Sequence, residues 1–334
     1  MTSLLVFGLS HRTARIEQRE KASLAEPAAR ALLRALAANA AVSDCAVIST
    51  CNRTEIAAIA ADPGVAAAAL SRALVAHSRI TAFELARASY RFCDEDAARH
   101  LCRVAASLDS MVVGESEVQG QVRAARELAR DEGTLGPRLD RAFTCALRAG
   151  SRARTRTRLA EGAVSVSSVA VELARAALGD LHGSRALLVG AGRAAEATAR
   201  ALLGHGVSEI VVANRSSLTA TRLAARFGGR AVGLDGLARE LRDADVVISS
   251  TDAPGTVIDA RQVTPGRRVL IDIAVPRDID PRAGDLPGVR LHNIDDLDRV
   301  VQANLDGRRR AAVRAEAIVE LEVRRFAAQD AEAA

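Results

Sequence analysis

Residues 186–195 read Ala-Leu-Leu-Val-Gly-Ala-Gly-Arg-Ala-Ala, and this stretch decides the fold of the second half of the chain. The apolar run 186–189 is typical of a buried strand, and the small residues after it permit a tight turn into a helix. Further short apolar runs, separated by helical segments or loops, follow at 209–213, 245–249, 269–273 and 289–291. This alternation predicts a parallel, doubly wound sheet that is buried on both faces.

The turn after the first of these strands has the spacing of a dinucleotide-binding loop. Its residues are Gly190, Ala191, Gly192, Arg193, Ala194 and Ala195. Such small residues let the helix N-terminal amides approach a pyrophosphate, so we expect this turn to bind one. The alternative is a degenerate domain of the same fold that binds no nucleotide.

The end of the next strand selects between the two nicotinamide dinucleotides. A carboxylate at that place would accept hydrogen bonds from a ribose 2′-hydroxyl, but the chain has Asn214, Arg215 and Ser216 there. An arginine and a hydroxyl suit a 2′-phosphate, which predicts NADPH as the cofactor.

The first half of the chain has a different pattern, in which helices and strands are mixed. Apolar runs predict strands at 3–9, 45–49 and 54–61. Stretches with helical spacing predict helices at 26–39, 64–77 and 94–106. This half is therefore expected to be an α+β domain.

The amino-acid composition excludes several classes of protein and modes of binding. The chain has 334 residues, of which 49% are hydrophobic and 26% charged, and this excludes a wholly disordered protein. The net charge of +5 permits a polyanionic partner, while the 2% aromatic content argues against base stacking as the main mode of nucleic-acid recognition. The cysteine spacing shows no metal-ligand pattern, and no secretory leader or membrane-spanning run is seen, so we expect a cytoplasmic protein without structural zinc.

One cysteine lies where a predicted strand leaves the core, in the segment 49–55, Ser-Thr-Cys-Asn-Arg-Thr-Glu. In an extended chain residues two apart share a face, so Arg53 is expected beside Cys51. A guanidinium there would lower the pKa of the thiol and bind a substrate carboxylate. Free cysteines are more commonly inert apolar residues, so local chemistry leaves both roles open. The remaining cysteines lie in apolar or helical patterns and are expected to be inert: Cys45, Cys93, Cys102 and Cys145.

Taken in order, many segments resemble the glutamyl-tRNA reductases of tetrapyrrole biosynthesis. They are 8–13, 49–55, 100–105, 108–115, 120–121, 154–157, 165–167, 190–195, 214–216 and 272–278, which together span almost the whole chain. The resemblance implies that Cys51 displaces tRNA from glutamyl-tRNA to form a thioester, which NADPH reduces to glutamate 1-semialdehyde. It also implies a catalytic role for His100. Considered alone, His100 and His11 would each be a histidine satisfied by a neighbour.

The same resemblance assigns a substrate pocket. Its positions are Thr50, Asn52, Arg53, Ser110, Glu115, Ser116, Glu117 and Gln121. Where the family usually has Gly-Glu-Pro-Gln, this chain has Gly-Glu-Ser-Glu at 114–117, so Glu117 adds a carboxylate. It would repel a bound glutamate unless it turned away or were protonated. A reductase of another aminoacyl-tRNA and a non-catalytic paralogue that binds tRNA or NADPH therefore stay open as alternatives.

A dehydrogenase of the shikimate type is a further alternative, because its nucleotide domain can carry a similar Asn-Arg-Ser signature. Such enzymes use a Lys/Asp pair in the substrate domain. The only lysine of this chain is Lys21, in a charged stretch that is typical of a solvated helix start.

The expected architecture is α/β. We expect an N-terminal α+β catalytic domain over 1–150, a Rossmann-like doubly wound NADP-binding domain with its leading helix over 151–296, and a long C-terminal helix over 297–334. Family members usually continue into a helical dimerisation domain, so a short member that is a monomer or a weak homodimer is expected. Besides glutamyl-tRNA, the downstream aminomutase is a candidate partner. Arginine-rich stretches at 148–158 and 308–310 are candidates for tRNA phosphate contacts, or are solvated helix faces.

Overall fold

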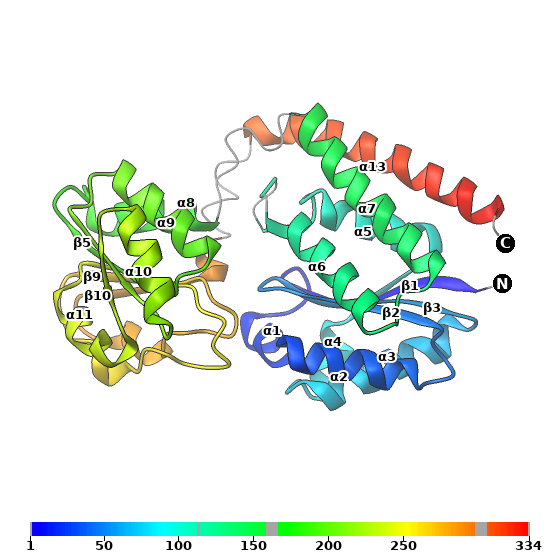
Figure 1. Ribbon diagram of the computed structural model, residues 1–334, viewed down its shortest axis with the longest axis horizontal. Helices are drawn as coiled ribbons and strands as arrows, with labels where there is room; N and C mark the ends of the chain where they lie inside the picture. The colour runs from blue at the N-terminus through cyan, green and yellow to red at the C-terminus, as the bar shows by residue number, and fades with distance from the viewer. Residues whose placement is uncertain (1, 112–113, 116, 158–165, 298–305, 333–334) are drawn as a thin grey trace. The chain divides into compact units, whose positions relative to one another are not determined.

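The computed structural model describes residues 2–111, 114–115, 117–157, 166–297 and 306–332. The chain divides into two compact units. The first unit comprises Met1–Ala163 and Leu305–Ala334, and the second unit comprises Val164–Asn304. Both units can be followed by their labelled elements in Figure 1. None of the described helices is both long and apolar enough to cross a membrane.

The first unit is built on a four-stranded sheet with the order β2-β3-β1-β4. Its strands are β1 (Ser3–Ser10), β2 (Asp44–Ser49), β3 (Arg53–Ala60) and β4 (Tyr90–Cys93). Strand β1 pairs antiparallel with both β3 and β4, and β2 and β3 form a hairpin. The short strand β4 was not predicted, because its four residues are only partly buried or exposed and show no apolar run.

Helices cover both faces of this sheet (Figure 1). One layer contains α1 (Ile16–Ala22), α2 (Glu26–Ala37), α3 (Pro63–His77) and α4 (Ala82–Ala88). The opposite layer contains α5 (Asp94–Ala105), α6 (Glu117–Asp131), α7 (Pro137–Arg156) and α13 (Asp306–Glu332). Alternate residues of each strand enter the two layers, so Arg53 and Glu55 share the face of Ala57 and Ile59, towards α5. The sheet thereby directs polar side chains into the α5 layer at one end.

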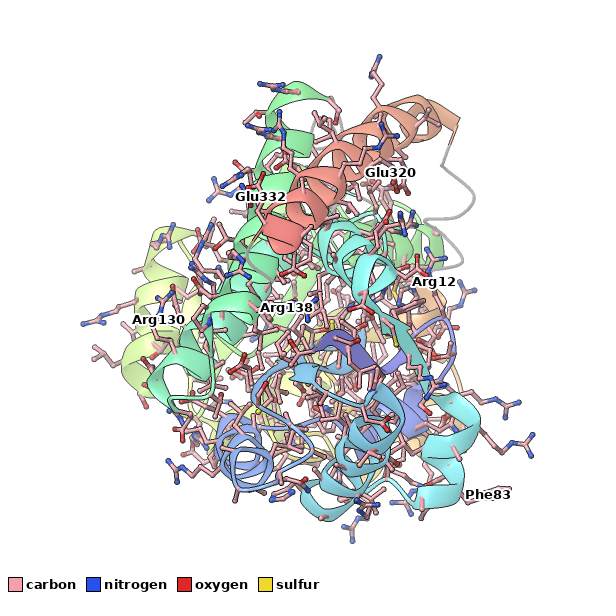
Figure 2. All side chains as sticks on the ribbon, turned by 90° about the vertical axis from the view of Figure 1, so that its right-hand side faces the viewer. Arg12, Phe83, Arg130, Arg138, Glu320 and Glu332 are labelled. Atoms are coloured by element: carbon pink, nitrogen blue, oxygen red, sulfur yellow. The ribbon has the colours of Figure 1, made fainter. Side chains whose placement is uncertain are left out.

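Helix α13 belongs to the first unit although it ends the described chain. One stripe of its apolar residues is buried in one core with α5 and α7, namely Ala311, Ala315, Val319, Val323 and Phe326. Ion pairs flank this core, at 2.7 Å between Arg99 and Glu320 and at 2.6 Å between Arg138 and Asp330. Arg138 and Glu320 are labelled in Figure 2. The helix is therefore part of the first unit's core, because its apolar stripe is buried there.

The expected arginine-rich stretch at 148–158 is largely the C-terminal half of α7. Arg152 forms an ion pair with Glu322 of α13, and Arg148 lies 3.9 Å from the same carboxylate. Glu322 is only 1% exposed, and a buried carboxylate is costly unless cations such as these pair with it. Arg148 and Arg152 therefore do not lie on a purely solvated face of α7. Arg158 and the side chains of 308–310 lie outside the described residues.

The second unit contains a six-stranded parallel sheet with the order β10-β9-β8-β5-β6-β7. Its strands are β5 (Arg185–Val189), β6 (Glu209–Ala213), β7 (Arg230–Val232), β8 (Val246–Ser249), β9 (Arg268–Asp272) and β10 (Val289–Asn293). Its helices are α8 (Val166–Leu178), α9 (Arg193–Gly204), α10 (Ser217–Arg226) and α11 (Leu237–Asp243), with 3₁₀ turns η2 (Leu234–Gly236), η3 (Ala260–Gln262) and η4 (Pro281–Asp285). The strand order reverses between β5 and β8, which creates the crevice where such sheets bind ligands.

The predicted fold class is confirmed: an α+β unit, a doubly wound parallel unit and a long C-terminal helix. The compact units differ from the expected boundaries at two points. Helix α7 continues without a break past 150 to Arg156, so residues 151–156 lie in the first unit. The C-terminal helix is also part of the first unit, because its apolar stripe is buried there.

Candidate active site

Cys51 lies in the turn between β2 and β3, where it is half-buried. Thr50 fixes this turn, because its Oγ1 accepts hydrogen bonds from the backbone N–H groups of Asn52 at 3.1 Å and Arg53 at 3.2 Å. The backbone N–H of His11 donates to the Asn52 carbonyl at 2.8 Å. The segment after β1 is thus tied directly to the cysteine turn.

Arg53 is not the activating neighbour of Cys51 that the sequence predicted. Its Nη1 donates to the carboxylates of Glu55 at 2.9 Å and Asp109 at 3.2 Å, and its Nη2 donates to the Asp109 backbone carbonyl. Burial acts to lower the pKa of Arg53, but Glu55, Tyr90 and Asp109 together outweigh it and raise that pKa. The prediction was wrong because alternation by two applies within a strand, whereas Cys51 precedes the strand.

Other charges act on the Cys51 thiol. Burial raises the pKa of Cys51 to about 12, and the nearby carboxylate of Glu115 and then that of Glu117 add to the rise. The guanidinium of Arg19, from α1, acts in the opposite direction. Without a bound substrate the thiol is therefore protonated at neutral pH, and it needs a proton acceptor to become a nucleophile.

His100 belongs to a buried cluster around Glu55. Glu55 accepts hydrogen bonds from Arg53, from the Tyr90 hydroxyl and, at 2.8 Å, from His100 Nε2. The imidazole stacks on Phe92 with 4.6 Å between ring centroids. Burial acts to raise the pKa of Glu55, but the facing His100 and Arg53 hold it below its usual range. His100 is thus satisfied by a neighbour, and its ring orientation is fixed.

Asp109 connects this cluster to a surface hollow. It binds Arg53 on one side and Arg12 on the other, at 2.7 Å from Oδ1 to Arg12 Nε. The hollow has a volume of about 500 Å³ and is lined by side chains of β4, of α5 and of the segments after β1 and α5, among them Tyr90, His100 and Asp109. Sequence reasoning assigned no role to Glu55, Tyr90 or Asp109. Glu55 and Asp109 lie inside the segments 49–55 and 108–115, and Tyr90 is the only tyrosine, so a signal was present.

Buried polar atoms near the cysteine turn have no hydrogen-bond partner among the residues that the structure describes. They include Asn52 Oδ1 and His11 Nδ1. Burial lowers the pKa of His11 to about 4, so its ring is neutral. His11 therefore differs from the satisfied histidine that the sequence predicted. Buried polar atoms are rarely left unpaired, so this arrangement is typical of a site that completes its hydrogen bonds with a ligand.

Two predicted pocket positions carry carboxylates. Glu115 is 7% exposed, and burial together with the Glu117 charge raises its pKa to about 7, against the influence of the neighbouring Ser110 hydroxyl. Glu117 begins α6, and Gln121 follows it on the same face of that helix. Gln121 lines a second hollow of about 360 Å³, which also contains Ser49. Ser116 lies outside the described residues.

In the second unit the predicted nucleotide turn lies at the point where the strand order reverses. Gly190 follows β5 with a φ of 106°, and a Cβ there would lie 2.7 Å from the carbonyl oxygen of Ser250, which follows β8. Only glycine fits this position. Helix α9 begins at Arg193, and a Cβ on its N-cap Gly192 would have no atom within 4 Å. The helix N-terminus is thus open to a pyrophosphate, and Ala195, 2% exposed, packs α9 closely.

The residues after β6 have partly structural roles. Ser216 caps α10 by accepting a hydrogen bond from the Thr219 N–H at 3.4 Å, and Asn214 Nδ2 donates to the Ser216 carbonyl at 3.2 Å. The Arg215 side chain is exposed. Of these three residues, Arg215 is therefore the one whose side chain is best placed to contact a phosphate on the ribose.

A doubly wound unit with an open dinucleotide turn places the chain among nucleotide-dependent oxidoreductases. The profile of the glutamyl-tRNAGlu reductase N-terminal domain matches residues 7–157, and that of shikimate/quinate 5-dehydrogenase matches residues 172–300. Glutamyl-tRNA reductase of Desulforudis audaxviator is 46% identical over 331 residues, which are 97% of this chain and 74% of the relative. That of Stenotrophomonas maltophilia is 44% identical over 97% of this chain and 76% of the relative.

A solved structure is similar over nearly the full length. Glutamyl-tRNA reductase from Methanopyrus kandleri is 34% identical, with a TM-score of 0.52, and the match covers 98% of this chain and 80% of that one. The chain belongs to the glutamyl-tRNA reductase family. It spans about three quarters of the length of the two curated relatives.

The shikimate dehydrogenase alternative is not supported. That profile matches 172–300, which lies wholly within the second unit, so the resemblance concerns the nucleotide-binding part. The lysine on which the alternative depends, Lys21, forms a partly exposed ion pair with Glu84 at 2.6 Å.

The raised pKa of Glu115 predicts a pH-dependent cost to stability. Its folded-state pKa of about 7 exceeds the ordinary value of 4.5, so the protonated form stabilises the fold below pH 4.5, and this stabilisation is lost as the pH rises towards 7. Replacing Glu115→Gln should remove this dependence. Relative to the wild type, the variant's free energy of unfolding should improve by on the order of 2–3 kcal/mol between pH 4.5 and pH 8. Urea unfolding at both pH values measures this, with Glu127→Gln on the exposed side of α6 as control. A pH-independent difference would contradict the assignment.

Proposed function

We propose that this chain is an NADPH-dependent reductase that converts glutamyl-tRNA to glutamate 1-semialdehyde, the first step of C5 tetrapyrrole biosynthesis. One observation carries the proposal: across 97% of its length the chain matches glutamyl-tRNA reductases. The site agrees with it, because Cys51 lies in a turn where Asn52 Oδ1 and the adjoining His11 Nδ1 are buried and have no hydrogen-bond partner among the described residues.

The proposed chemistry begins at the cysteine turn. The Cys51 thiolate attacks the carbonyl carbon of the glutamyl ester, the ribose oxygen leaves with a proton, and a thioester forms on Sγ. Glu115 is suited to accept the thiol proton, since its pKa is about 7 and its charge acts on Cys51. When bound, a reduced nicotinamide supplies the hydride that converts the thioester to the aldehyde. The Cys51 thiolate is then released unchanged.

The pocket residues are proposed to hold the aminoacyl group. Asn52 presents an unpartnered buried oxygen to it, and Thr50 holds the turn in place. Arg53 and His100 both bond to Glu55, and we propose that they act through this cluster, which orients them. They would contact the substrate directly only if it replaced Glu55 as their partner. Further contacts are assigned to the other predicted positions, Ser110, Ser116, Glu117 and Gln121.

The charge of Glu117 is the reason to consider a second substrate. Its charge raises the pKa of both Cys51 and Glu115, so it acts on the interior of the site. This favours a test of several aminoacyl-tRNAs, because a neutral acyl group would avoid the repulsion that a glutamate side chain meets.

The remaining assignments concern the cofactor and partners. Arg215 and the open N-terminus of α9 support NADPH, held along 190–195 with Asn214 and Ser216 nearby. We propose a cytoplasmic protein that passes its aldehyde product to the downstream aminomutase. Because α13 buries its main apolar stripe within its own unit, we also propose a monomer or weak homodimer.

The nucleophile is tested by the substitution Cys51→Ser. Loss of the thiolate should abolish aldehyde formation from glutamyl-tRNA and NADPH, because no thioester can form. The matched control is Cys93→Ser, at another half-buried cysteine of the same unit, which should keep most of the activity. Wild-type turnover by Cys51→Ser would exclude the thioester mechanism.

Cofactor choice is tested by Arg215→Ala. Losing a charge-assisted contact of about 1.5–3 kcal/mol should raise the NADPH dissociation constant roughly ten- to a hundredfold and leave that for NADH unchanged. Fluorescence titration with both dinucleotides measures this, with Arg222→Ala on the exposed face of α10 as control. Equal affinity of the wild type for NADPH and NADH would refute the assignment.

The tRNA surface is tested by salt dependence. If α7 contacts phosphates through Arg156, the affinity for tRNA should fall steeply with salt. Arg156→Gln should reduce the slope of log affinity against log salt concentration by about 1. Arg72→Gln, at an exposed position of α3, serves as control. A wild-type affinity that does not change with salt would remove the arginine stretch from the binding surface.

A further inference from the structure

A pair of thiols lies between α5 and α7, apart from the cysteine turn. The sulfur atoms of Cys102 and Cys145 are 3.6 Å apart, and the two residues are 0% and 7% exposed. Their apolar and helical sequence patterns predicted that both would be inert. We propose that they form an oxidation-sensitive dithiol, which closes to a disulfide when a hydroperoxide reacts with Cys145.

The packing of the two helices brings the sulfurs together. Helices α5 and α7 approach so closely that a Cβ on Gly150 would overlap the carbonyl of Ala105. Alanines such as Ala146 and Ala149 fill this part of the core, so no large side chain separates the thiols. A disulfide requires about 2.05 Å between sulfurs, so closure from 3.6 Å needs a further approach of about 1.5 Å.

The two thiols are not equivalent. Cys145 lines a hollow of about 150 Å³ together with Arg148, Glu322 and Arg325, whereas Cys102 is fully enclosed. A hydrogen bond from Cys102 lowers the pKa of Cys145, against the effects of burial and of the Glu322 charge, and the Arg148 guanidinium helps to lower it. The same hydrogen bond raises the pKa of Cys102, and burial adds to the rise. Cys145 is therefore the accessible nucleophile, and Cys102 is the thiol that resolves the product.

The oxidation balances with hydrogen peroxide as the oxidant. The Cys145 thiolate attacks one peroxide oxygen, the O–O bond breaks, and the leaving oxygen takes a proton to become water. Cys145 is then a sulfenic acid. Cys102 attacks its sulfur, the S–O bond breaks, and the departing hydroxide takes the Cys102 proton as a second water. Two electrons pass from the two thiols to the peroxide.

Closure would change the contacts of α13. In the reduced pair the Cys145 thiol donates to the backbone carbonyl of Glu322 at 3.3 Å, and the disulfide has no proton to donate. Cys102 also lies two residues after His100 on α5, and His100 bonds to Glu55. The thiol pair is therefore close along the chain to the Glu55 cluster. In a reducing compartment such a bond is transient, which suits a sensor more than a permanent crosslink.

Peptide mapping of the wild-type protein tests the proposal. The reduced protein is treated with hydrogen peroxide, remaining thiols are alkylated, and peptides are analysed without reduction. We expect a crosslinked peptide that joins Cys102 to Cys145 and disappears on treatment with dithiothreitol. The readout is thiol chemistry because Cys51, the proposed nucleophile, would itself be oxidised and would confuse an activity assay.

Three variants separate the roles. Cys102→Ala should leave Cys145 as a sulfenic acid that dimedone labels, and Cys145→Ala should slow the oxidation of Cys102 at least tenfold. The control Cys45→Ala, at a buried thiol whose pKa burial raises to about 12, should form the disulfide at the wild-type rate. Oxidation of Cys51 and Cys93 while Cys102 and Cys145 stay alkylatable would overturn the proposal. That result needs no substitution, so it decides the matter even if a variant fails to fold.

Discussion

The first unit depends on one buried guanidinium, that of Arg53. Its side chain is 2% exposed, and it bonds to Glu55 on its own strand and to Asp109 in the segment after α5. Removing either carboxylate would leave this buried charge with only one anionic partner, and loss of compensation for a buried charge is among the most costly defects in a protein interior. The guanidinium therefore fixes the start of β3, the His100 ring through Glu55, and the end of the cysteine turn.

This arrangement divides the charges of the site into two groups. Glu55 accepts three hydrogen bonds at Oε1 and is held as a carboxylate, whereas Glu115 is buried beside the Glu117 charge and titrates near neutrality. Environments that move carboxylate pKa values apart in this way create an acid–base pair from identical groups. The charge of Glu115 acts on Cys51, so the carboxylate that can accept a proton lies near the thiol that must release one.

Helix α13 shows the same physics at the edge of the unit. Glu322 is almost completely buried, and it is tolerated because arginines of α7 compensate its charge. The apolar stripe of α13 then completes the core that holds Cys102 and Cys145 in contact. The pairing of Glu322 with arginines of α7 thus contributes to the packing of Cys102 against Cys145 in the interior.

The sequence by itself determined the doubly wound sheet, the glycine turn of the nucleotide site and most of the strands of the first unit, because these depend on local periodicity and backbone conformation. It also singled out Cys51 and the pocket segments. Only the tertiary structure decided the partners of Arg53, the pairing of Arg152 with Glu322, the burial of His11 Nδ1 without a partner among the described residues, and the contact of Cys102 with Cys145. These depend on distances between segments far apart in the chain, which packing sets and local pattern does not encode.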